Sequence, residues 1–299
     1  MDRRLFIRKS SRVLFLLANP GILPSPDDTR VSFGLITDLH FANRQNAGTR
    51  FYSESKKKLL DAIEVFNRKD PDFLIELGDL KDQGDPPVKD QTIMFLDEIE
   101  YTLKGFKGPL YHVLGNHDMD SISKSDFLTH TYNSEKAKGQ NYYSFIKNGI
   151  KFIVLDANYN QDGSDYDSGN FDWTYSKIPE NQLQWLHNEL SKDNSPSIVF
   201  IHQLLDSFSG ISELVCVKNA EDVITILEKS NNVLAVFQGH HHEGNYSFRN
   251  GIHYFTMKAM VEGPLPDNNS YAVVEIDYDL NISIEGFYNC KDQFMKRNL

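Results

Sequence analysis

The feature that most constrains how this 299-residue chain folds is a series of short apolar runs separated by segments with helical periodicity. Each run has the length of a buried strand, and the segments between several of them carry apolar residues three and four positions apart, as helices do. Strands that alternate with helices predict a layered α/β (α+β) architecture. The runs are Val31–Ile36, Phe73–Leu77, Leu110–Leu114, Phe152–Leu155, Ile198–Ile201 and Val233–Phe237.

The C-terminal part of the chain has a different pattern. From His253 to Tyr288 apolar and polar side chains tend to alternate, which predicts antiparallel strands that complete a second sheet. From Val31 onward no internal repeat, low-complexity tract or convincing interdomain linker is present. We therefore predict a single domain over residues 31–299.

Polar side chains follow five of the six runs at the point where each run ends. Because ligands of open α/β sheets bind just beyond the carboxyl ends of the strands, these side chains are expected to surround one point. Each alone has an ordinary explanation as a helix cap, a turn residue or a hydrogen-bonded core histidine, but five together favour a common site. The residues delivered in this way are Asp38 and His40, Asp79, Asn116 with His117 and Asp118, His202, and His240 with His242.

The donor types in this set indicate the metals that they would bind. Imidazole nitrogens, carboxylates and one amide oxygen, with no thiolate, suit manganese, iron, zinc or nickel rather than a structural zinc site. Asp38 and His40 are two residues apart on an extended segment, so both side chains can face the same way. His240 and His242 repeat this spacing after the last run. The sequence therefore predicts a metal centre.

The order of the five blocks, Asp-x-His, Gly-Asp, Gly-Asn-His-Asp, a single His and Gly-His-x-His, resembles that of the calcineurin-like metallophosphoesterases. The resemblance extends from Val31 to about Tyr288. It implies a four-layer α-β-β-α sandwich, in which two mixed sheets pack together with helices outside. It also implies a metal-dependent hydrolase of phosphoric esters with two divalent cations, manganese or iron being favoured over zinc or nickel.

The same resemblance assigns a role to each block. A hydroxide shared by the two ions would attack the phosphorus in line. His117 would contact the phosphate and assist the departing group, and Asp118 would orient His117. The implied ligands are Asp38, His40 and His242 for one ion, Asn116, His202 and His240 for the other, and Asp79 as the bridge between them.

The family includes protein phosphatases, phosphodiesterases, nucleases, nucleotidases and diphosphatases, so the blocks alone do not choose a substrate. The stretches Thr49–Lys56 and Gln182–Leu186 are similar to the manganese-dependent ADP-ribose/CDP-alcohol diphosphatases, whereas His40 is a first-block histidine that cyclic-nucleotide phosphodiesterases keep. We therefore expect hydrolysis of a phosphodiester or diphosphate in a nucleotide-like small molecule. The alternative is a phosphomonoesterase acting on a phosphoprotein, sugar phosphate or nucleotide; a nuclease or a non-catalytic scaffold is less favoured.

Asp82 and His40 argue against one class within the family, the purple acid phosphatases. Asp82 stands three residues after the aspartate of the Gly-Asp block, where purple acid phosphatases usually carry a tyrosine. Those enzymes also lack the first-block histidine, which is present here as His40. A tyrosinate–iron site is therefore not expected.

The segment that follows the first block contains three candidates for binding the substrate. Arg44 and Arg50 carry guanidinium groups suited to a second phosphate, and the ring of Tyr52 is suited to stacking on a base. The competing interpretation is that Tyr52 begins a helix and packs inward while the arginines are solvated. Further along, Asn158–Trp173 is rich in Asn, Asp, Gly and Tyr, which predicts a long surface loop near the site.

The formal net charge is −11, from 31 basic and 42 acidic residues. Proteins that bind a nucleic-acid backbone usually carry an excess of positive charge. A nucleic-acid partner is therefore disfavoured, and a small-molecule phosphoester is the expected partner. Two cysteines, Cys216 and Cys290, are too few for a disulfide framework.

The first thirty residues form a separate segment. Four basic residues within Arg3–Lys9 precede a short apolar stretch, Val13–Ala18. This order is typical of a bacterial secretory signal, and Arg3–Lys9 resembles a twin-arginine export signal. The apolar stretch is too short for a transmembrane anchor. Residues 1–30 therefore predict an exported, periplasmic protein, the alternative being a cytoplasmic protein with an amphipathic N-terminal helix.

Overall fold

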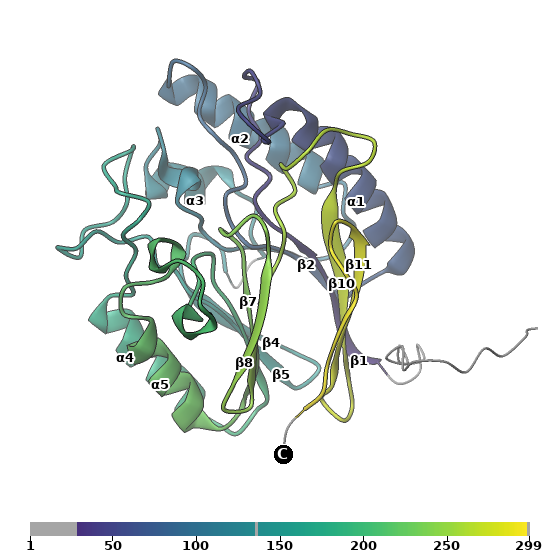
Figure 1. Cartoon of the computed structure of the whole chain (residues 1–299), viewed down its shortest axis with the longest axis vertical. Coiled ribbons are helices and arrows are strands. Elements are labelled where there is room, and N and C mark those ends of the chain that lie inside the picture. The colour runs from purple at the N-terminus through teal and green to yellow at the C-terminus, as the bar shows by residue number, and fades with distance from the viewer. Residues whose placement is uncertain (1–28, 135–136, 298–299) are drawn as a thin grey trace, which may run out of the picture.

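The computed structural model describes residues 29–134 and 137–297. Two six-stranded sheets pack against each other, and helices lie outside them (Figure 1). In the first sheet the strand order is β12-β11-β10-β1-β2-β3, with β1, β2 and β3 parallel and the C-terminal strands antiparallel. Its strands are β1 (Thr29–Ile36), β2 (Phe73–Glu76), β3 (Leu110–His112), β10 (Ser270–Asp277), β11 (Ile282–Tyr288) and β12 (Gln293–Met295).

The second sheet has the order β4-β5-β6-β7-β9-β8. Its four central strands are parallel, and an antiparallel strand closes each edge. The parallel strands of both sheets deliver their carboxyl ends to the loops that carry the site. The strands are β4 (Tyr143–Lys147), β5 (Ile150–Val154), β6 (Ser197–Phe200), β7 (Val233–Gln238), β8 (Asn245–Arg249) and β9 (Ile252–Thr256).

The helices lie on the outer sides of the sandwich. In Figure 1 α1 and α2 lie beside the first sheet and α3 packs against α2, while α4 and α5 pack together against the second sheet. The helices are α1 (Ser55–Lys69), α2 (Lys89–Leu103), α3 (Lys124–His130), α4 (Glu180–Ser191) and α5 (Ala220–Ser230). Short 3₁₀ turns are η2 (Tyr52–Glu54), η3 (His117–Met119), η4 (Ser207–Ser209) and η5 (Glu213–Val215).

Aromatic side chains fill the space between the sheets. Phe33 of β1 is fully buried and stacks on Phe73 of the neighbouring strand, with ring centroids 5.2 Å apart. Its edge contacts reach across to Phe152, Phe200 and Phe237 of the second sheet, at 5.5–5.9 Å. Such edge-to-face pairs add to the free energy gained by burying large apolar surface. This core holds the two sheets in contact beneath the loops of the site.

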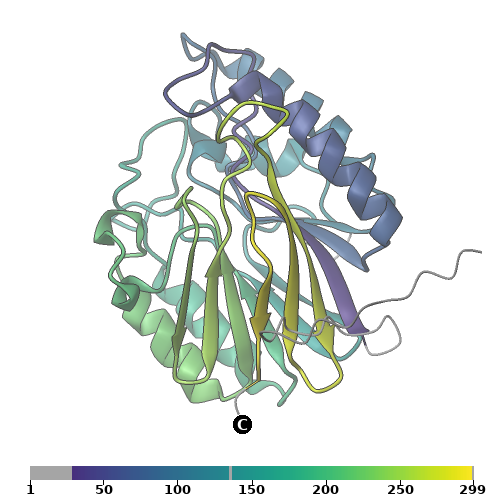
Figure 2. The ribbon, with the colours of Figure 1, turned by 45° about the vertical axis from the view of Figure 1, so that its right-hand side comes forward.

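All six strands predicted from the apolar runs are confirmed, with ends that differ by at most two residues. The prediction for the C-terminal tail is wrong in part. The strands β10, β11 and β12 join β1 in the first sheet, as Figure 2 shows for the yellow strands beside purple β1, and β9 pairs in parallel with β7. Strand pairing depends on contacts between distant segments, which alternation within one segment does not specify.

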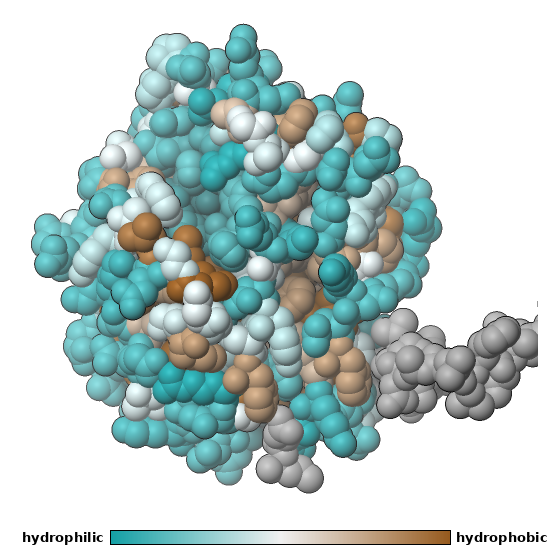
Figure 3. Space-filling model, viewed as in Figure 1, coloured by the Kyte–Doolittle hydropathy of each residue, from teal (hydrophilic) through white to brown (hydrophobic). Residues whose placement is uncertain are grey.

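The export segment predicted over residues 1–30 lies almost wholly outside the described residues, so it stays a prediction. Among the helices of the described ranges, none combines the length and the apolar content needed to cross a bilayer. The face of the molecule seen in Figure 3 is largely hydrophilic, with its hydrophobic residues gathered in small patches.

Candidate metal centre

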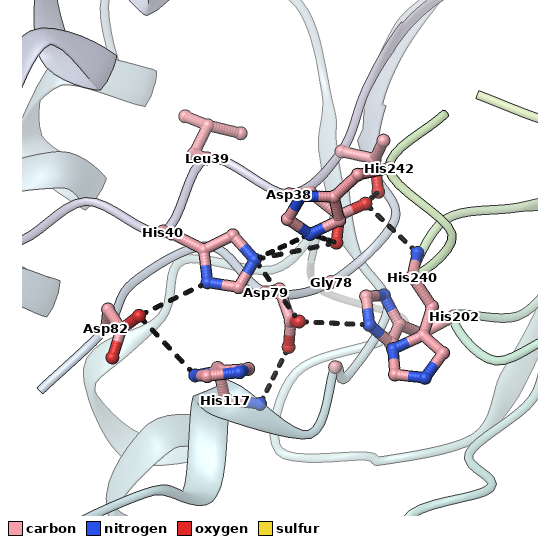
Figure 4. Close-up of polar contacts among 12 residues, drawn as sticks. Asp38, Leu39, His40, Gly78, Asp79, Asp82, His117, His202, His240 and His242 are labelled. Carbon is pink, nitrogen blue, oxygen red and sulfur yellow. Dashed lines mark hydrogen bonds and ion pairs between the residues drawn. The ribbon is translucent and has the colours of Figure 1, made fainter. Parts of the chain in front are cut away.

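The polar residues expected to surround one point do converge, in loops after the carboxyl ends of strands from both sheets (Figure 4). Loops after β1, β2 and β3 come from the first sheet, and loops after β6 and β7 come from the second. The carboxylate of Asp79 lies between His40 and His202 and so connects the two contributions. The first sheet supplies Asp38, His40, Asp79, Asn116 and His117, and the second supplies His202, His240 and His242.

Two glycines allow these loops to approach one another. A Cβ on Gly78 would lie 2.6 Å from the backbone nitrogen of Gly115 and 2.7 Å from Nδ1 of His202. A Cβ on Gly115 would lie 2.2 Å from the backbone nitrogen of Asp79. Separations this short are not tolerated, so both positions require glycine.

The backbone is also strained at the site. Four of its non-glycine residues have left-handed φ angles, which are rare for L-residues and cluster where function over-determines the structure. The turns aim the side chains inward, at the expense of local stability. These residues are Asp38 (φ 51°), His40 (φ 46°), Asp79 (φ 57°) and His240 (φ 64°).

One group of donor atoms surrounds Asp38. Its Oδ1 lies 3.4 Å from Nε2 of His242 and 3.7 Å from Nε2 of His40, and the two Nε2 atoms are 3.3 Å apart. Asp79 Oδ2 completes the group at 3.5 Å from Nε2 of His40. Asp38 Oδ1 is buried and accepts no hydrogen bond. A buried carboxylate oxygen without a donor is unfavourable unless a cation compensates it.

A second group lies on the other side of Asp79. Its Oδ2 is 3.2 Å from Nε2 of His202, and the ligand atoms of Asp79, His202 and His240 all lie within 4.8 Å of one another. Nε2 of His202, Nε2 of His240 and Oδ1 of Asn116 are buried and make no hydrogen bond. Asp79 Oδ2 thus belongs to both groups.

On three of the rings the nitrogen away from the cluster faces an acceptor, and for His202 and His242 it makes a hydrogen bond. Nδ1 of His202 donates to the backbone carbonyl of Leu77 over 2.8 Å. Nδ1 of His242 donates to Oε1 of Glu262 over 2.6 Å, and Nδ1 of His40 lies 3.4 Å from Oδ2 of Asp82. An acceptor at Nδ1 leaves the lone pair of Nε2 free, which is how proteins orient histidines that bind metals. Glu262 and Asp82 were not among the predicted site residues.

Protons on the histidines compensate the negative charge of the buried carboxylates. Burial lowers the pKa of His202, but Asp79 and Asp38 outweigh it and raise this pKa to about 10. At His240 burial and the neighbouring charge of His202 lower the pKa to about 3. Burial opposes ionisation of Asp79, yet the neighbouring histidines hold its pKa well below the usual value. Divalent cations would supply the same compensation, so the donor set fits them.

His117 is the accessible histidine beside this cluster. Its side chain is 29% exposed, and its ring lies 4.6 Å from that of His40. Nδ1 of His117 lies 3.5 Å from Oδ2 of Asp82. Burial lowers the pKa of His117, but Asp79 and Asp82 outweigh it and raise this pKa above its usual value. His117 is therefore placed to carry a proton toward a bound substrate.

The expectation that Asp118 orients His117 is wrong. Both oxygens of Asp118 accept hydrogen bonds from the backbone, from the N–H groups of Asp79 (3.0 Å), Leu80 (3.0 Å) and Gly115 (2.8 Å). Asp118 therefore fixes the turn that presents Asp79. The carboxylate beside His117 is that of Asp82, whose spacing three residues after Asp79 was the available sequence signal.

The predicted substrate contacts are only partly available. The ring of Tyr52 is 4% exposed, because it packs into the core where η2 leads into α1, so the expectation that it stacks on a base is wrong. The guanidinium of Arg44 covers this ring at 4.9 Å and lies 3.7 Å from Asp82. Arg50 remains a candidate, since its positive charge acts on His242 and Glu262.

Residues 31–244 match the calcineurin-like phosphoesterase family, and the chain belongs to that family. It is a metal-dependent hydrolase of phosphoric esters, as the order of its blocks indicates. Among solved structures, a dimetal phosphatase from Danio rerio has the same fold, with a TM-score of 0.77 at 21% identity. That likeness covers 91% of this chain and 100% of the other, and it confirms the expected sandwich.

Two kinds of curated relative are similar over most of their length. A manganese-dependent ADP-ribose/CDP-alcohol diphosphatase of Arabidopsis thaliana is 26% identical over 295 residues, which cover 85% of this chain and 93% of the relative. A 3′,5′-cyclic-nucleotide phosphodiesterase of Nostoc sp. is 24% identical over 228 residues, which cover 75% and 76%.

Proposed function

We propose that this protein hydrolyses a phosphodiester or diphosphate bond of a nucleotide-like small molecule with the help of two divalent cations. The observation that carries the proposal is the position of Asp79, whose Oδ2 faces His40 at 3.5 Å and His202 at 3.2 Å. One carboxylate oxygen shared by two groups of inward-facing donors is suited to bridging two cations.

Two observations support the residues that would hold the cations: the clustering of their ligand atoms, and four buried ligand atoms without a hydrogen bond, on Asp38, Asn116, His202 and His240. Asp38, His40 and His242 would hold one, and Asn116, His202 and His240 the other, with Asp79 common to both. The relatives named as manganese-dependent support manganese, and the nitrogen and oxygen donors also suit iron, zinc or nickel. Bound cations would neutralise phosphate charge and make bound water more acidic.

The protein's own residues would do the remaining work. His117 would donate a proton or hydrogen bond to the oxygen of the departing group, because its ring is accessible and adjoins the cluster. Asp82 would position His117 and His40 together, since its Oδ2 lies within 3.5 Å of an Nδ1 of each ring. Asp118 would hold the turn of Asp79.

The substrate class rests on the names of the relatives and on charge. ADP-ribose, CDP-alcohols and cyclic nucleotides, which those names print, are all nucleotide derivatives with a phosphodiester or a diphosphate. The net charge of −11 gives no general attraction for a nucleic-acid backbone. A small molecule that reaches the two-cation site is therefore the expected substrate.

The test is hydrolysis of a panel of phosphate esters by the full chain, stripped of metal and reconstituted with manganese. The panel contains bis-p-nitrophenyl phosphate, p-nitrophenyl phosphate, cyclic AMP, ADP-ribose and CDP-choline. The proposal predicts turnover of diesters or diphosphates that is lost in Asp79→Asn. Turnover of the monoester alone would favour a phosphomonoesterase, and no turnover of any ester would contradict the proposal.

A further inference from the structure

Trp173 lies beside the metal centre without belonging to it. Its ring centroid is 6.2 Å from that of His240, at 60° between the planes, and the residue is 50% exposed. Across residues 29–134 and 137–297, Trp173 is the one non-histidine ring in contact with a histidine of the centre. The exposed indole thus lies next to His240, which is itself only partly buried.

Trp173 lies in a turn closed by hydrogen bonds. The N–H of Tyr175 donates to the carbonyl of Asp172 over 2.9 Å, which closes a turn with Trp173 at its second position. Oδ1 of Asp172 also accepts from the backbone nitrogen of Thr174 at 2.9 Å and from its hydroxyl at 2.6 Å. These bonds fix the backbone from which the side chain of Trp173 projects.

The loop that carries this turn is fixed to the body of the protein. Tyr166 is fully buried and stacks on Phe171 at 4.4 Å, and its hydroxyl donates to the carbonyl of Tyr175. Gly169 donates from its backbone to the carbonyl of Met119, in the turn that also contains His117. The loop predicted over Asn158–Trp173 is thus near the site, and it is connected to the segment that carries His117.

Of the aromatic residues near the first block, Phe51 is half-buried and the other two offer no face to a ligand. Phe41 and Tyr52 are each 4% exposed and belong to the core. The ring of Trp173 is an exposed flat apolar surface in contact with a donor of the second cation group. Indole rings stack on nucleobases of any kind, because every base presents a π-face.

His117 and Trp173 lie at opposite ends of the cluster, so they would contact different parts of the substrate. His117 adjoins His40 on one side of Asp79, and Trp173 adjoins His240 on the other. If His117 serves the departing group, an aromatic group on the side of Trp173 is the one that remains on the phosphate. We propose that Trp173 forms a stacking subsite for the nucleobase retained on the phosphate after hydrolysis, an inference that rests on the proposed function.

A pair of esters with the same departing group isolates this subsite. Thymidine 5′-(p-nitrophenyl phosphate) and methyl p-nitrophenyl phosphate both release p-nitrophenolate, but only the first retains a base. Trp173→Ala is expected to raise KM for the thymidine ester by about 5- to 150-fold, the range that the loss of one base–aromatic stack predicts. Its kcat/KM for the methyl ester should stay near that of the unmodified protein.

Two matched variants complete the kinetic test. Trp173→Phe keeps an aromatic face, so its KM for the thymidine ester should stay close to that of the unmodified protein. Tyr101→Ala removes another exposed aromatic side chain, 78% exposed on α2, and should change neither ester. Equal losses on both esters in Trp173→Ala would mean that Trp173 only supports His240, and this would overturn the subsite.

A binding measurement tests the subsite independently of turnover. The chain has two tryptophans, and Trp185 packs against the core beside Tyr142, with ring centroids 5.0 Å apart. Trp185→Phe therefore leaves Trp173 as the only tryptophan reporter. With manganese present, AMP should quench its fluorescence in a saturable way, and ribose 5-phosphate, which lacks a base, should not.

The two measurements separate failure of the subsite from failure of the proposed function. Saturable quenching by AMP without turnover of either ester would contradict the proposed function and uphold the subsite. Absence of quenching by AMP, or equal quenching by ribose 5-phosphate, would overturn the subsite whether or not the esters are hydrolysed.

Discussion

Nδ1 of His242 donates a hydrogen bond of 2.6 Å to Oε1 of Glu262, on the side of the ring away from Asp38. The hydrogen bond from His242 outweighs partial burial and lowers the pKa of Glu262 to about 2, so its carboxylate is ionised at neutral pH. The loop of Glu262 is itself clamped, since Nζ of Lys58 donates to the carbonyls of Met260, Glu262 and Gly263. Glu262 thus keeps Nε2 of His242 directed at Asp38.

Glu262→Gln should weaken metal binding. The amide can still accept a hydrogen bond from Nδ1, but it lacks the negative charge that makes the imidazole a better donor to a cation. Loss of such a carboxylate typically weakens metal affinity by about 10- to 100-fold, which titration of the metal-stripped protein with manganese measures. Glu243→Gln, an exposed carboxylate one residue after His242, is the control. Unchanged affinity in Glu262→Gln would refute its assigned role.

His117→Ala and Asp118→Asn should differ in how their effects depend on the departing group. A proton donor matters most for a poor departing group, so His117→Ala should lose about 10²- to 10⁴-fold on an alkyl ester and far less on a p-nitrophenyl ester. Asp118 holds backbone N–H groups, so Asp118→Asn should lower kcat similarly on both esters and lower the free energy of unfolding. A loss in Asp118→Asn that grows as the departing group worsens would restore it as the partner of His117.

Stability should fall at alkaline pH because of a buried histidine beneath the site. His112 lies 3.3 Å from Glu76 and 3.0 Å from Glu100; burial lowers its pKa, but the two carboxylates, Glu100 first, outweigh it and raise the pKa to about 10. The folded protein therefore keeps a proton that the unfolded chain loses near pH 6.5. The stabilisation is complete below pH 6.5 and is lost as the pH rises through about 10, with a slope of up to about 1.4 kcal/mol per pH unit.

The measurement is the free energy of unfolding in urea as a function of pH. The difference between the unmodified protein and His112→Gln should shrink as the pH rises from 6.5 to about 10. His130→Gln, which breaks an exposed pair with Asp97, is the control and should have little effect at any pH. A difference that stays constant over this range would show that His112 is not charged in the folded state.

Much of the fold followed from the sequence because local patterns specify local structure. The run Val31–Ile36 lies within β1, and the residues beyond it turn into the site as expected. The pairing of β10 with β1 was not predictable, because alternation shows which side chains are buried and not which strand lies next to them.

The site was predictable to the extent that its residues occur in short blocks at strand ends. Asp82 and Glu262 were missed because they act through histidines that come from other blocks, and only the folded chain brings them together. Glu262 lies 20 residues after His242 and outside any block. Tyr52 was misjudged because an aromatic residue next to an arginine has the same pattern in a core as in a binding site.

The central claim is that Asp79 bridges two cations, and counting the metal ions bound per chain tests it most directly. The full chain, equilibrated with manganese and freed of excess metal, is predicted to hold two ions, whereas Asp79→Asn should hold at most one tightly and hydrolyse no diester. Asp222→Asn, an exposed change on α5, should keep both ions. Two tightly bound ions in Asp79→Asn would contradict the account.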